Sequence, residues 1–216
     1  MPIIEQTKVG RHIAYALWQI TESEEELLAN LSLNEIELDE FQTISHKRKR
    51  LEWLGARNAL KILLQPHGQF YIYKDSNGKP FLDDSTIGIS MSHAGQFGAA
   101  AIHLNGSIGI DVEIERLQVL NIAKKFLHPQ ESKTIPKTIE ELTRVWSTKE
   151  ALYKLFGRKQ ITFKTDLVVA AESHQESPPF KKYLAGYKNV ECITLHYCPV
   201  AGLHITIALP VQSARS

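Results

Sequence analysis

The spacing of hydrophobic positions predicts the elements of the N-terminal half. Residues 11–20 alternate imperfectly between polar and apolar side chains and predict a strand. Thr21 followed by Glu24 has the capping-box pattern, which predicts a helix over residues 24–30. Residues 45–64 predict a longer helix because their leucines form one apolar stripe. That stripe consists of Leu51, Leu54, Leu60, Leu63 and Leu64.

Turn residues divide the next part of the chain into short strands. The sequence Pro66-His67-Gly68 ends the long helix. Asn77-Gly78 is the strongest hairpin signal, and it separates predicted strands at residues 71–73 and 79–82. Two further strands are predicted at residues 87–93 and at residues 98–104, where small residues indicate a buried position.

The C-terminal half repeats this order of elements. Asn105-Gly106 forms a turn before a strand at residues 108–114, and a helix begins at residues 122–126. Residues 139–156 predict a strong helix that ends at Gly157. Four strands are then expected, with a loop at residues 173–179; the strands are residues 161–169, 180–186, 190–197 and 203–209.

Each half therefore contains a helix followed by about three antiparallel strands. With 216 residues, this order predicts an α+β protein of two pseudo-symmetric lobes, each a helix packed on a small antiparallel sheet. The expected domains are residues 1–104 and 105–216.

Composition and charge limit the classes of partner. Hydrophobic residues make up 43% and charged residues 23%, with a net charge of +1, so no overall field favours nucleic acid or a membrane surface. We expect a cytoplasmic protein, since the first residues do not resemble a signal peptide and no apolar run reaches about 20 residues. Cys192 and Cys198 are expected to be free thiols. His196 lies between them, but three residues in one segment are weak evidence for zinc.

Two carboxylates lie two residues apart in the predicted strand at residues 108–114. Asp111 and Glu113 therefore point to the same side, and like charges at that distance are unfavourable unless a cation lies between them. Oxygen ligands suit Mg²⁺. The same spacing also fits a solvated edge strand, and spacing alone leaves both interpretations open.

The long C-terminal helix adds a third carboxylate. Glu150 and Lys154 are four residues apart and share a face, as do Trp146 and Glu150. An ordinary surface ion pair would show the same spacing, with a contribution of about 0.3–0.5 kcal/mol.

Candidate anion-binding residues lie in the N-terminal half. Ser92-His93 at a strand end offers hydrogen-bond donors to a phosphate, although it also fits a loop without function. Arg50 and Arg57 lie two helical turns apart and share a face that suits phosphate or simply solvent. The sequence has neither a Walker A motif nor a G-x-G-x-x-G motif.

Together these motifs resemble the 4′-phosphopantetheinyl transferase superfamily, in its two-lobed Sfp type. Residues 109–113 fit G-[I/V]-D-[I/V]-E, and residues 146–154 fit W-[S/T]-x-K-E-[A/S]-x-x-K. Lys79-Pro80, Ser92-His93 and the arginine-bearing helix fit the N-terminal half of the family. Phe126-Leu127 with Glu131 resembles its F-[L/F]-x-x-x-E segment. The resemblance covers residues 45 to 160.

The resemblance implies a transferase of the holo-[acyl-carrier-protein] synthase type. Such an enzyme moves the 4′-phosphopantetheine arm of coenzyme A to a serine of an apo acyl or peptidyl carrier protein and releases 3′,5′-ADP. The active site would lie in the cleft between the lobes. A catalytically silent CoA-binding module and a Mg²⁺-dependent phosphohydrolase are the alternatives.

The resemblance also assigns roles to residues. Mg²⁺, or Mn²⁺, would be held by Asp111, Glu113 and Glu150, with Asp111, Glu150 and Lys154 catalytic. CoA would be bound by seven residues, namely Arg50, Arg57, Lys79, Ser92, His93, Lys149 and Lys154. Glu131 would support the carrier serine. Carrier docking is expected near Lys124, Lys125 and Phe126, and the expected state is a monomer without nucleic-acid or membrane partners.

Overall fold

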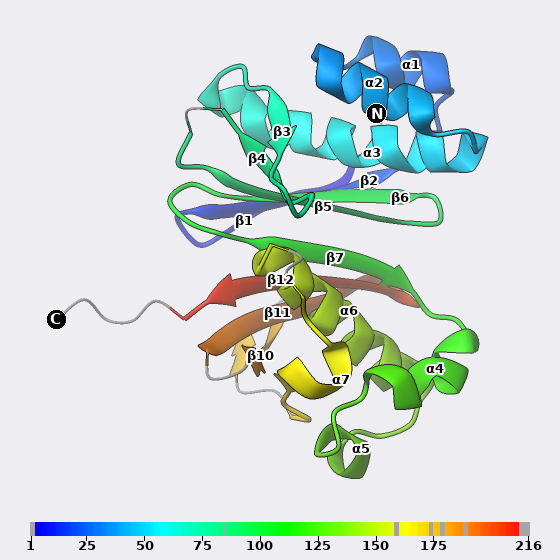
Figure 1. Cartoon of the computed structure of the whole chain (residues 1–216), viewed down its shortest axis with the longest axis vertical. Helices are drawn as coiled ribbons and strands as arrows, with labels where there is room; N and C mark the ends of the chain where they lie inside the picture. The colour runs from blue at the N-terminus through cyan, green and yellow to red at the C-terminus, as the bar shows by residue number, and fades with distance from the viewer. Residues whose placement is uncertain are drawn as a thin grey trace, which may run out of the picture. The chain divides into compact units, whose positions relative to one another are not determined.

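The computed structural model describes residues 3–83, 85–157, 160–172, 175–177, 180–187 and 190–211. The chain divides into two compact units, Met1–Val112 and Glu113–Ser216. This division falls within strand β7 (Gly109–Ile114), whereas the sequence suggested a boundary before Asn105. Each unit packs a long helix on an antiparallel sheet, so the predicted α+β class is confirmed (Figure 1).

The sheet of the first unit has the strand order β1-β2-β6-β5 and is antiparallel throughout. Its strands are β1 (Ile3–Val9), β2 (Ile13–Gln19), β5 (Gly88–Ala94) and β6 (Phe97–His103). The turns between β1 and β2 and between β5 and β6 each begin with a glycine of positive φ, Gly10 at 75° and Gly95 at 60°. Every residue of β6 is buried, as its run of alanines predicts.

Three helices and a small hairpin complete the first unit. They are α1 (Glu24–Ala29), α2 (Glu35–Thr43), α3 (Lys47–Leu64), the 3₁₀ turn η1 (Gln65–His67), β3 (Ile72–Lys74) and β4 (Pro80–Leu82). Helix α3 lies directly on β6 because both backbones carry glycine at the contact. A Cβ atom on Gly98 would come within 2.4 Å of the Gly55 carbonyl carbon.

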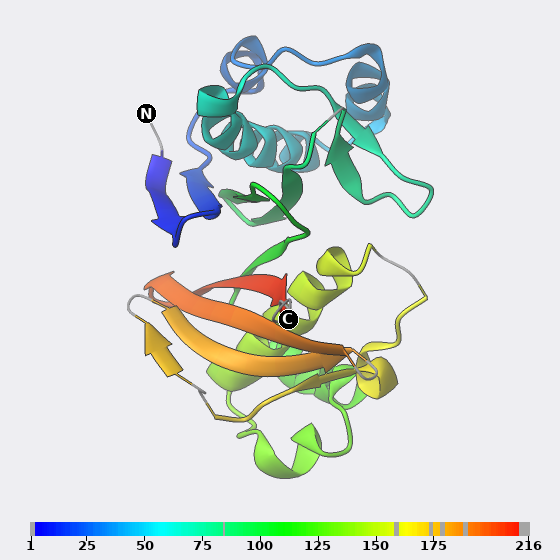
Figure 2. The ribbon, with the colours of Figure 1, turned by 90° about the vertical axis from the view of Figure 1, so that its left-hand side faces the viewer.

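The second unit is organised around α6 (Ile139–Leu155), which packs on β12 and β11 (Figure 2). Its sheet has the order β7-β12-β11-β10-β8, with β9 paired to β10. The other strands are β8 (Leu167–Val169), β9 (Gln175–Ser177), β10 (Phe180–Tyr187), β11 (Val190–Val200) and β12 (Leu203–Pro210). The remaining helices are α4 (Gln118–Phe126), α5 (Glu131–Thr134) and α7 (Phe163–Asp166). Among the described residues, none of the helices has the length and hydrophobicity to span a bilayer.

The strand predicted at residues 11–20 is confirmed as β2, whereas β1 and α2 were not predicted. Three local predictions were wrong. The capping box of α1 uses Ser23 and Glu26, because each side chain bonds the other's backbone N–H (3.2 and 2.9 Å). The predicted strand at residues 161–169 is instead α7 followed by β8. Of the predicted loop at residues 173–179, residues 175–177 form β9 and the others lie outside the described residues.

Candidate active site

Strand β7 presents Asp111 on a buried backbone. Ile110 and Val112 are buried on the other side of the strand, as the alternation predicts. Asp111 is only 3% exposed, and its Oδ1 accepts a hydrogen bond of 2.9 Å from the Ser92 hydroxyl on β5. The neighbouring Ser90 hydroxyl accepts from the Ile110 N–H at 3.0 Å. Two serines of β5 therefore bond residues 110 and 111, and one of them orients the Asp111 carboxylate.

Glu113 is oriented by a tryptophan of α6. The Glu113 Oε1 accepts a hydrogen bond of 2.9 Å from the Trp146 indole N–H. The indole ring in turn packs against Phe126 and Phe163, with centroid distances of 5.2 and 5.4 Å. The sequence placed Trp146 on the same helical face as Glu150 but gave no partner for its indole N–H. The structure adds that this residue orients a candidate metal ligand, because its N–H needs a partner while its ring is packed.

Glu150 and Lys154 follow Trp146 on α6. Trp146, Glu150 and Lys154 are successive residues at a spacing of four, so they form one row along the helix. All three are partly exposed, whereas Lys149 and Ala151 beside Glu150 are buried. Lys154 lies in the last turn, where a cation also interacts favourably with the helix dipole. The row is therefore accessible to a ligand while the adjacent positions hold the helix in the core.

The proposed metal ligands have suitable chemistry for a hard cation. Asp111, Glu113 and Glu150 offer only oxygen atoms, which Mg²⁺ and Mn²⁺ prefer over nitrogen or sulfur. Ser92 and Trp146 each donate to one oxygen of a carboxylate that has further lone pairs for a metal. Such outer donors are typical of metal sites, because they orient the ligating group. The chemistry of these donors therefore suits a hard divalent cation such as Mg²⁺.

Ser92 and His93 point to opposite faces of β5, as adjacent strand residues must. Ser92 is buried, and its hydroxyl donates to Asp111, so Ser92 lies on the face of β5 that contacts this carboxylate. His93 is 39% exposed, and its Nδ1 lies 3.2 Å from Glu52 Oε2 on α3. Lys79 is half-buried at the end of the β3–β4 turn, where its backbone N–H donates to Asp75 Oδ1 at 2.9 Å.

The two arginines of α3 are engaged by carboxylates of their own unit. Arg50 donates to both oxygens of Glu24, at 2.9 and 2.6 Å, and this pairing raises its pKa. Arg57 is 6% exposed and its guanidinium lies 3.2 Å from the centroid of the Trp53 ring.

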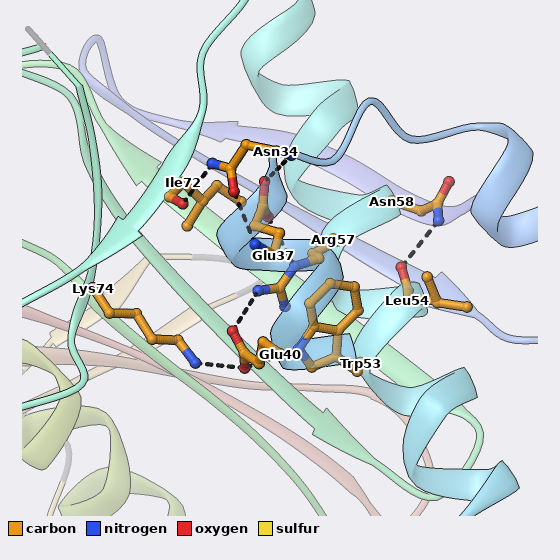
Figure 3. Close-up of polar contacts among 9 residues, drawn as sticks. All are labelled: Asn34, Glu37, Glu40, Trp53, Leu54, Arg57, Asn58, Ile72 and Lys74. Atoms are coloured by element: carbon orange, nitrogen blue, oxygen red, sulfur yellow. Dashed lines mark hydrogen bonds and ion pairs between the residues drawn. The ribbon is translucent and has the colours of Figure 1, made fainter. Parts of the chain in front are cut away.

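Figure 3 shows Arg57 enclosed by acids of α2. Its Nε donates to Glu37 Oε1 at 3.1 Å, and its Nη2 lies 3.5 Å from Glu40 Oε2. Burial lowers the Arg57 pKa, and Glu40 and Glu37 oppose that change. A phosphate would have to replace these carboxylates, so in this arrangement Arg57 joins α3 to α2.

Lys149 does not face the row of Glu150; it is 0% exposed. Its Nζ donates to the backbone carbonyls of Phe126, Phe163 and Leu167, at 2.8, 2.8 and 3.0 Å, and lies 2.7 Å from Glu131 Oε2. Burial lowers the Lys149 pKa, and Glu131 opposes this. The expected contact of Lys149 with CoA is corrected, because all its donors serve the interior of the second unit.

Glu131 is also structural. It is 1% exposed, and its two oxygens accept backbone N–H groups of Val169 and His128 at 2.8 and 2.7 Å. The Lys149–Glu131 pair therefore connects two of the sequence motifs inside the protein. Phe126, which was expected near a docked carrier, is 2% exposed and belongs to the core, whereas Lys124 and Lys125 are exposed on α4.

Comparison with known proteins agrees with the motifs of the second half. Residues 107–208 match the family model described as the 4′-phosphopantetheinyl transferase superfamily. The matched segment is just under half of the chain and contains Asp111, Glu113, Glu150 and Lys154. It supports a transferase acting with phosphopantetheine in general. Comparison with curated proteins gave no match.

Proposed function

We propose that this protein transfers the 4′-phosphopantetheine arm of CoA to a serine of an apo carrier protein, as a two-lobed member of the matched superfamily. The observation that carries the proposal is the pair of oriented carboxylates on β7, held by Ser92 and Trp146, inside the matched segment. Accessible Glu150 and Lys154 lie in line with Trp146 on α6. The cosubstrate would be CoA and the metal Mg²⁺.

In the proposed reaction the carrier serine oxygen forms a bond to the β-phosphorus of CoA. The bond from that phosphorus to the bridging oxygen breaks, and 3′,5′-ADP leaves. When bound to Asp111, Glu113 and Glu150, Mg²⁺ would neutralise charge on the pyrophosphate. Lys154 would place its ammonium against the leaving phosphate. The serine proton passes to Glu150, directly or through water, to the extent that this carboxylate is not occupied by metal.

CoA contacts in the first unit are proposed for His93 and Lys79. His93 has an exposed imidazole, and Lys79 lies in a half-buried turn, whereas Arg57 is committed to Glu37 and Glu40. Ser92 is proposed to act through Asp111 rather than on the nucleotide. Arg50 remains a weaker candidate, because phosphate would compete with its bidentate bond to Glu24.

Carrier docking is proposed on the exposed face of α4. Leu117 and Leu120 are 69% and 41% exposed, and Lys124 continues the same helical face. Apolar side chains beside a lysine suit a partner that carries acidic residues around its modified serine. Family carriers of that kind include acyl and peptidyl carrier proteins.

The test is a mass measurement of the carrier. The protein is incubated with CoA, Mg²⁺ and several apo carriers, alongside carriers whose acceptor serine is replaced by alanine. We expect a mass gain of one phosphopantetheine arm on the acceptor serine only, with equal release of 3′,5′-ADP. Release of 3′,5′-ADP without a carrier would indicate a phosphohydrolase, and CoA binding without any product would indicate a silent module; either result overturns the proposal.

The Asp111→Asn variant tests the metal role. It keeps the shape and the bond from Ser92 but removes the charge, so we expect transfer to fall by about 10²–10³-fold or more, the range for losing one preorganised electrostatic group. Circular dichroism and the melting temperature should show a folded protein. A folded Asp111→Asn variant with normal transfer and normal Mg²⁺ dependence would exclude Asp111 as a ligand.

A further inference from the structure

A second group of metal-ligating side chains lies in the second unit, on the hairpin of β11 and β12. His196 and Cys198 come from β11, and His204 comes from β12. His196 is 6% and His204 0% exposed, whereas the Cys198 residue is exposed. This group takes no part in the proposed transfer reaction.

The register of the hairpin brings the three side chains together. His196 pairs with Thr206, and the pairing shifts between Tyr197 and Val200. Such an irregularity re-aims side chains, and here it brings the Cys198 thiol over the neighbouring strand. The turn between β11 and β12 is held to the residue after β7, because the Glu115 N–H donates to the Gly202 carbonyl at 2.8 Å.

The three ligand atoms form a triangle of the size that a zinc ion requires. His196 Nε2 lies 3.2 Å from His204 Nδ1, and Cys198 Sγ lies 3.6 and 3.8 Å from these two nitrogens. A tetrahedral zinc ion with Zn–N of about 2.0–2.1 Å and Zn–S of about 2.3 Å has edges of about 3.3 Å between nitrogens and about 3.6 Å between nitrogen and sulfur. The observed triangle therefore matches one face of such a tetrahedron.

Both imidazoles are oriented by outer partners. His204 Nε2 lies 2.9 Å from Glu115 Oε1. Because a carboxylate only accepts, the proton of the neutral imidazole lies on Nε2, and Nδ1 then carries the lone pair. His196 Nδ1 lies 3.0 Å from Thr206 Oγ1, which itself accepts from the Ser147 hydroxyl of α6 at 3.1 Å. With the His196 proton on Nδ1, its Nε2 lone pair faces that of His204. Two facing lone pairs at 3.2 Å repel each other unless a cation or a proton lies between them.

The charges around the group are compatible with a divalent ion. Arg144 and Lys181 place positive charge near His196, and the Arg144 guanidinium is paired with Glu141 at 2.9 Å. Glu115 and a Cys198 thiolate would supply two negative charges. Binding of a metal to the Cys198 sulfur would release the thiol proton to solvent.

We propose that His196 Nε2, His204 Nδ1 and Cys198 Sγ form a binding site for a zinc-type divalent ion, with water as the fourth ligand on the exposed side of Cys198. Two nitrogens and one thiolate select such an ion over Mg²⁺. The site would join β11 to β12 and, through Thr206 and Ser147, to α6. The competing arrangement is a hydrogen-bonded chain from Glu115 through both histidines to Thr206, with a proton between the rings and no metal.

Cobalt provides the direct test, because a thiolate ligand gives Co²⁺ a charge-transfer absorption that carboxylates do not. The full-length protein is freed of metal and titrated with Co²⁺ in excess Mg²⁺, which saturates the proposed acidic site. We expect one Co²⁺ per chain with the thiolate band and tetrahedral visible bands, both removed by Zn²⁺. The band should be lost in Cys198→Ser and retained in Cys192→Ala, the matched control with the other thiol.

A second measurement needs no variant. Zn²⁺ should slow alkylation of Cys198 by iodoacetamide, followed by peptide mass, and should raise the melting temperature of the protein. Absence of the thiolate band in the unmodified protein, or a band that persists in Cys198→Ser, overturns the site. An alkylation rate unchanged by Zn²⁺ overturns it as well and leaves the hydrogen-bonded chain. Transfer to a carrier is a separate measurement, so failure of this site leaves the proposed function intact.

Discussion

The long helices of the two units contain the same local arrangement with opposite electrostatic outcomes. On α3 the Trp53 indole donates to Glu40 at 3.0 Å, and the residue four positions later is Arg57, which reaches the same carboxylate. On α6 the Trp146 indole donates to Glu113 at 2.9 Å, and the residue four positions later is another acid, Glu150. The first arrangement closes an ion pair, whereas the second has an acid in place of the arginine, which is the arrangement proposed to bind a cation.

The comparison distinguishes the buried cations of these two helices from the positions that are accessible to a ligand. Both helices contain a buried cation, Arg57 on α3 and Lys149 on α6, and both looked from the sequence like phosphate-binding residues. Arg57 is surrounded by two carboxylates and a ring, and Lys149 by three carbonyls and one carboxylate. In α6 the proposed chemistry is assigned instead to the adjacent, partly exposed row of Trp146, Glu150 and Lys154. Four substitutions test this division, beginning with the largest expected effect.

Replacing Lys149 with methionine should destabilise the protein most. Glu131 would keep its charge in the interior without its cation, and breaking a buried pair in this way costs about 3–5 kcal/mol. Three carbonyls would also lose a donor. Urea unfolding followed by circular dichroism measures the free energy of unfolding.

The double variant Lys149→Met/Glu131→Gln controls for the loss of volume. It should be more stable than Lys149→Met alone, because the buried charge is gone while the amide oxygen still accepts a backbone N–H. A single variant as stable as the original protein would show that Lys149 is not committed to the core and would restore it as a candidate for CoA.

Arg57→Met is the corresponding change in the first unit, with a smaller expected effect. Glu40 retains Lys74 and the Trp53 N–H, so mainly Glu37 is left buried without its cation, at a cost of about 1–3 kcal/mol. Unfolding measured as for Lys149 gives the comparison. A stable Arg57→Met variant with a greatly raised KM for CoA would contradict the structural role and support the phosphate contact expected from sequence.

Periodicity predicted the parts of the fold that are decided by local apolar spacing. The helix predicted at residues 139–156 is α6 (Ile139–Leu155), and that predicted at 45–64 is α3 (Lys47–Leu64). Strand β1 was missed because its side chains alternate between half-buried and exposed positions, with polar residues on the exposed side. Helix α2 is short, and its buried residues include the charged Glu37, which no apolar pattern would mark.

The sequence predicted only those features of the candidate site that depend on the spacing of residues within one strand or one helix. The common side of Asp111 and Glu113 and the row of Glu150 and Lys154 follow from strand and helix periods. The donors Ser92 and Trp146 come from other elements, so their partners depend on tertiary packing. The same limit applied to His196 and Cys198, because His204, the third residue of the proposed metal site, is brought to them by pairing between β11 and β12.

Trp146→Phe tests whether the tryptophan orients a metal ligand. The ring packing stays, but Glu113 loses its donor, and loss of an outer-shell partner lowers metal affinity or activity by about 10–100-fold. The Mg²⁺ concentration that gives half-maximal transfer should therefore rise. Trp53→Phe is the matched control, since it removes the equivalent bond to Glu40 on α3 and should leave the Mg²⁺ dependence unchanged. Equal behaviour of the two variants would contradict the distinction between the helices.

His93→Ala should have the smallest effect, and it tests whether the two faces of β5 have different roles. The exposed imidazole is proposed to contribute one contact to CoA, so its loss should raise the KM for CoA by about 3–10-fold with little change in kcat, as for a single hydrogen bond of about 1 kcal/mol. Ser92 lies one residue away on the opposite face and is proposed to act through Asp111. Ser92→Ala should therefore lower kcat and raise the Mg²⁺ concentration that gives half-maximal transfer. His67→Ala, an exposed histidine of η1, serves as the control and should change neither constant. If His93→Ala leaves the KM unchanged, the CoA contact of the first unit must lie elsewhere, with Lys79 and Arg50 as the next residues to replace.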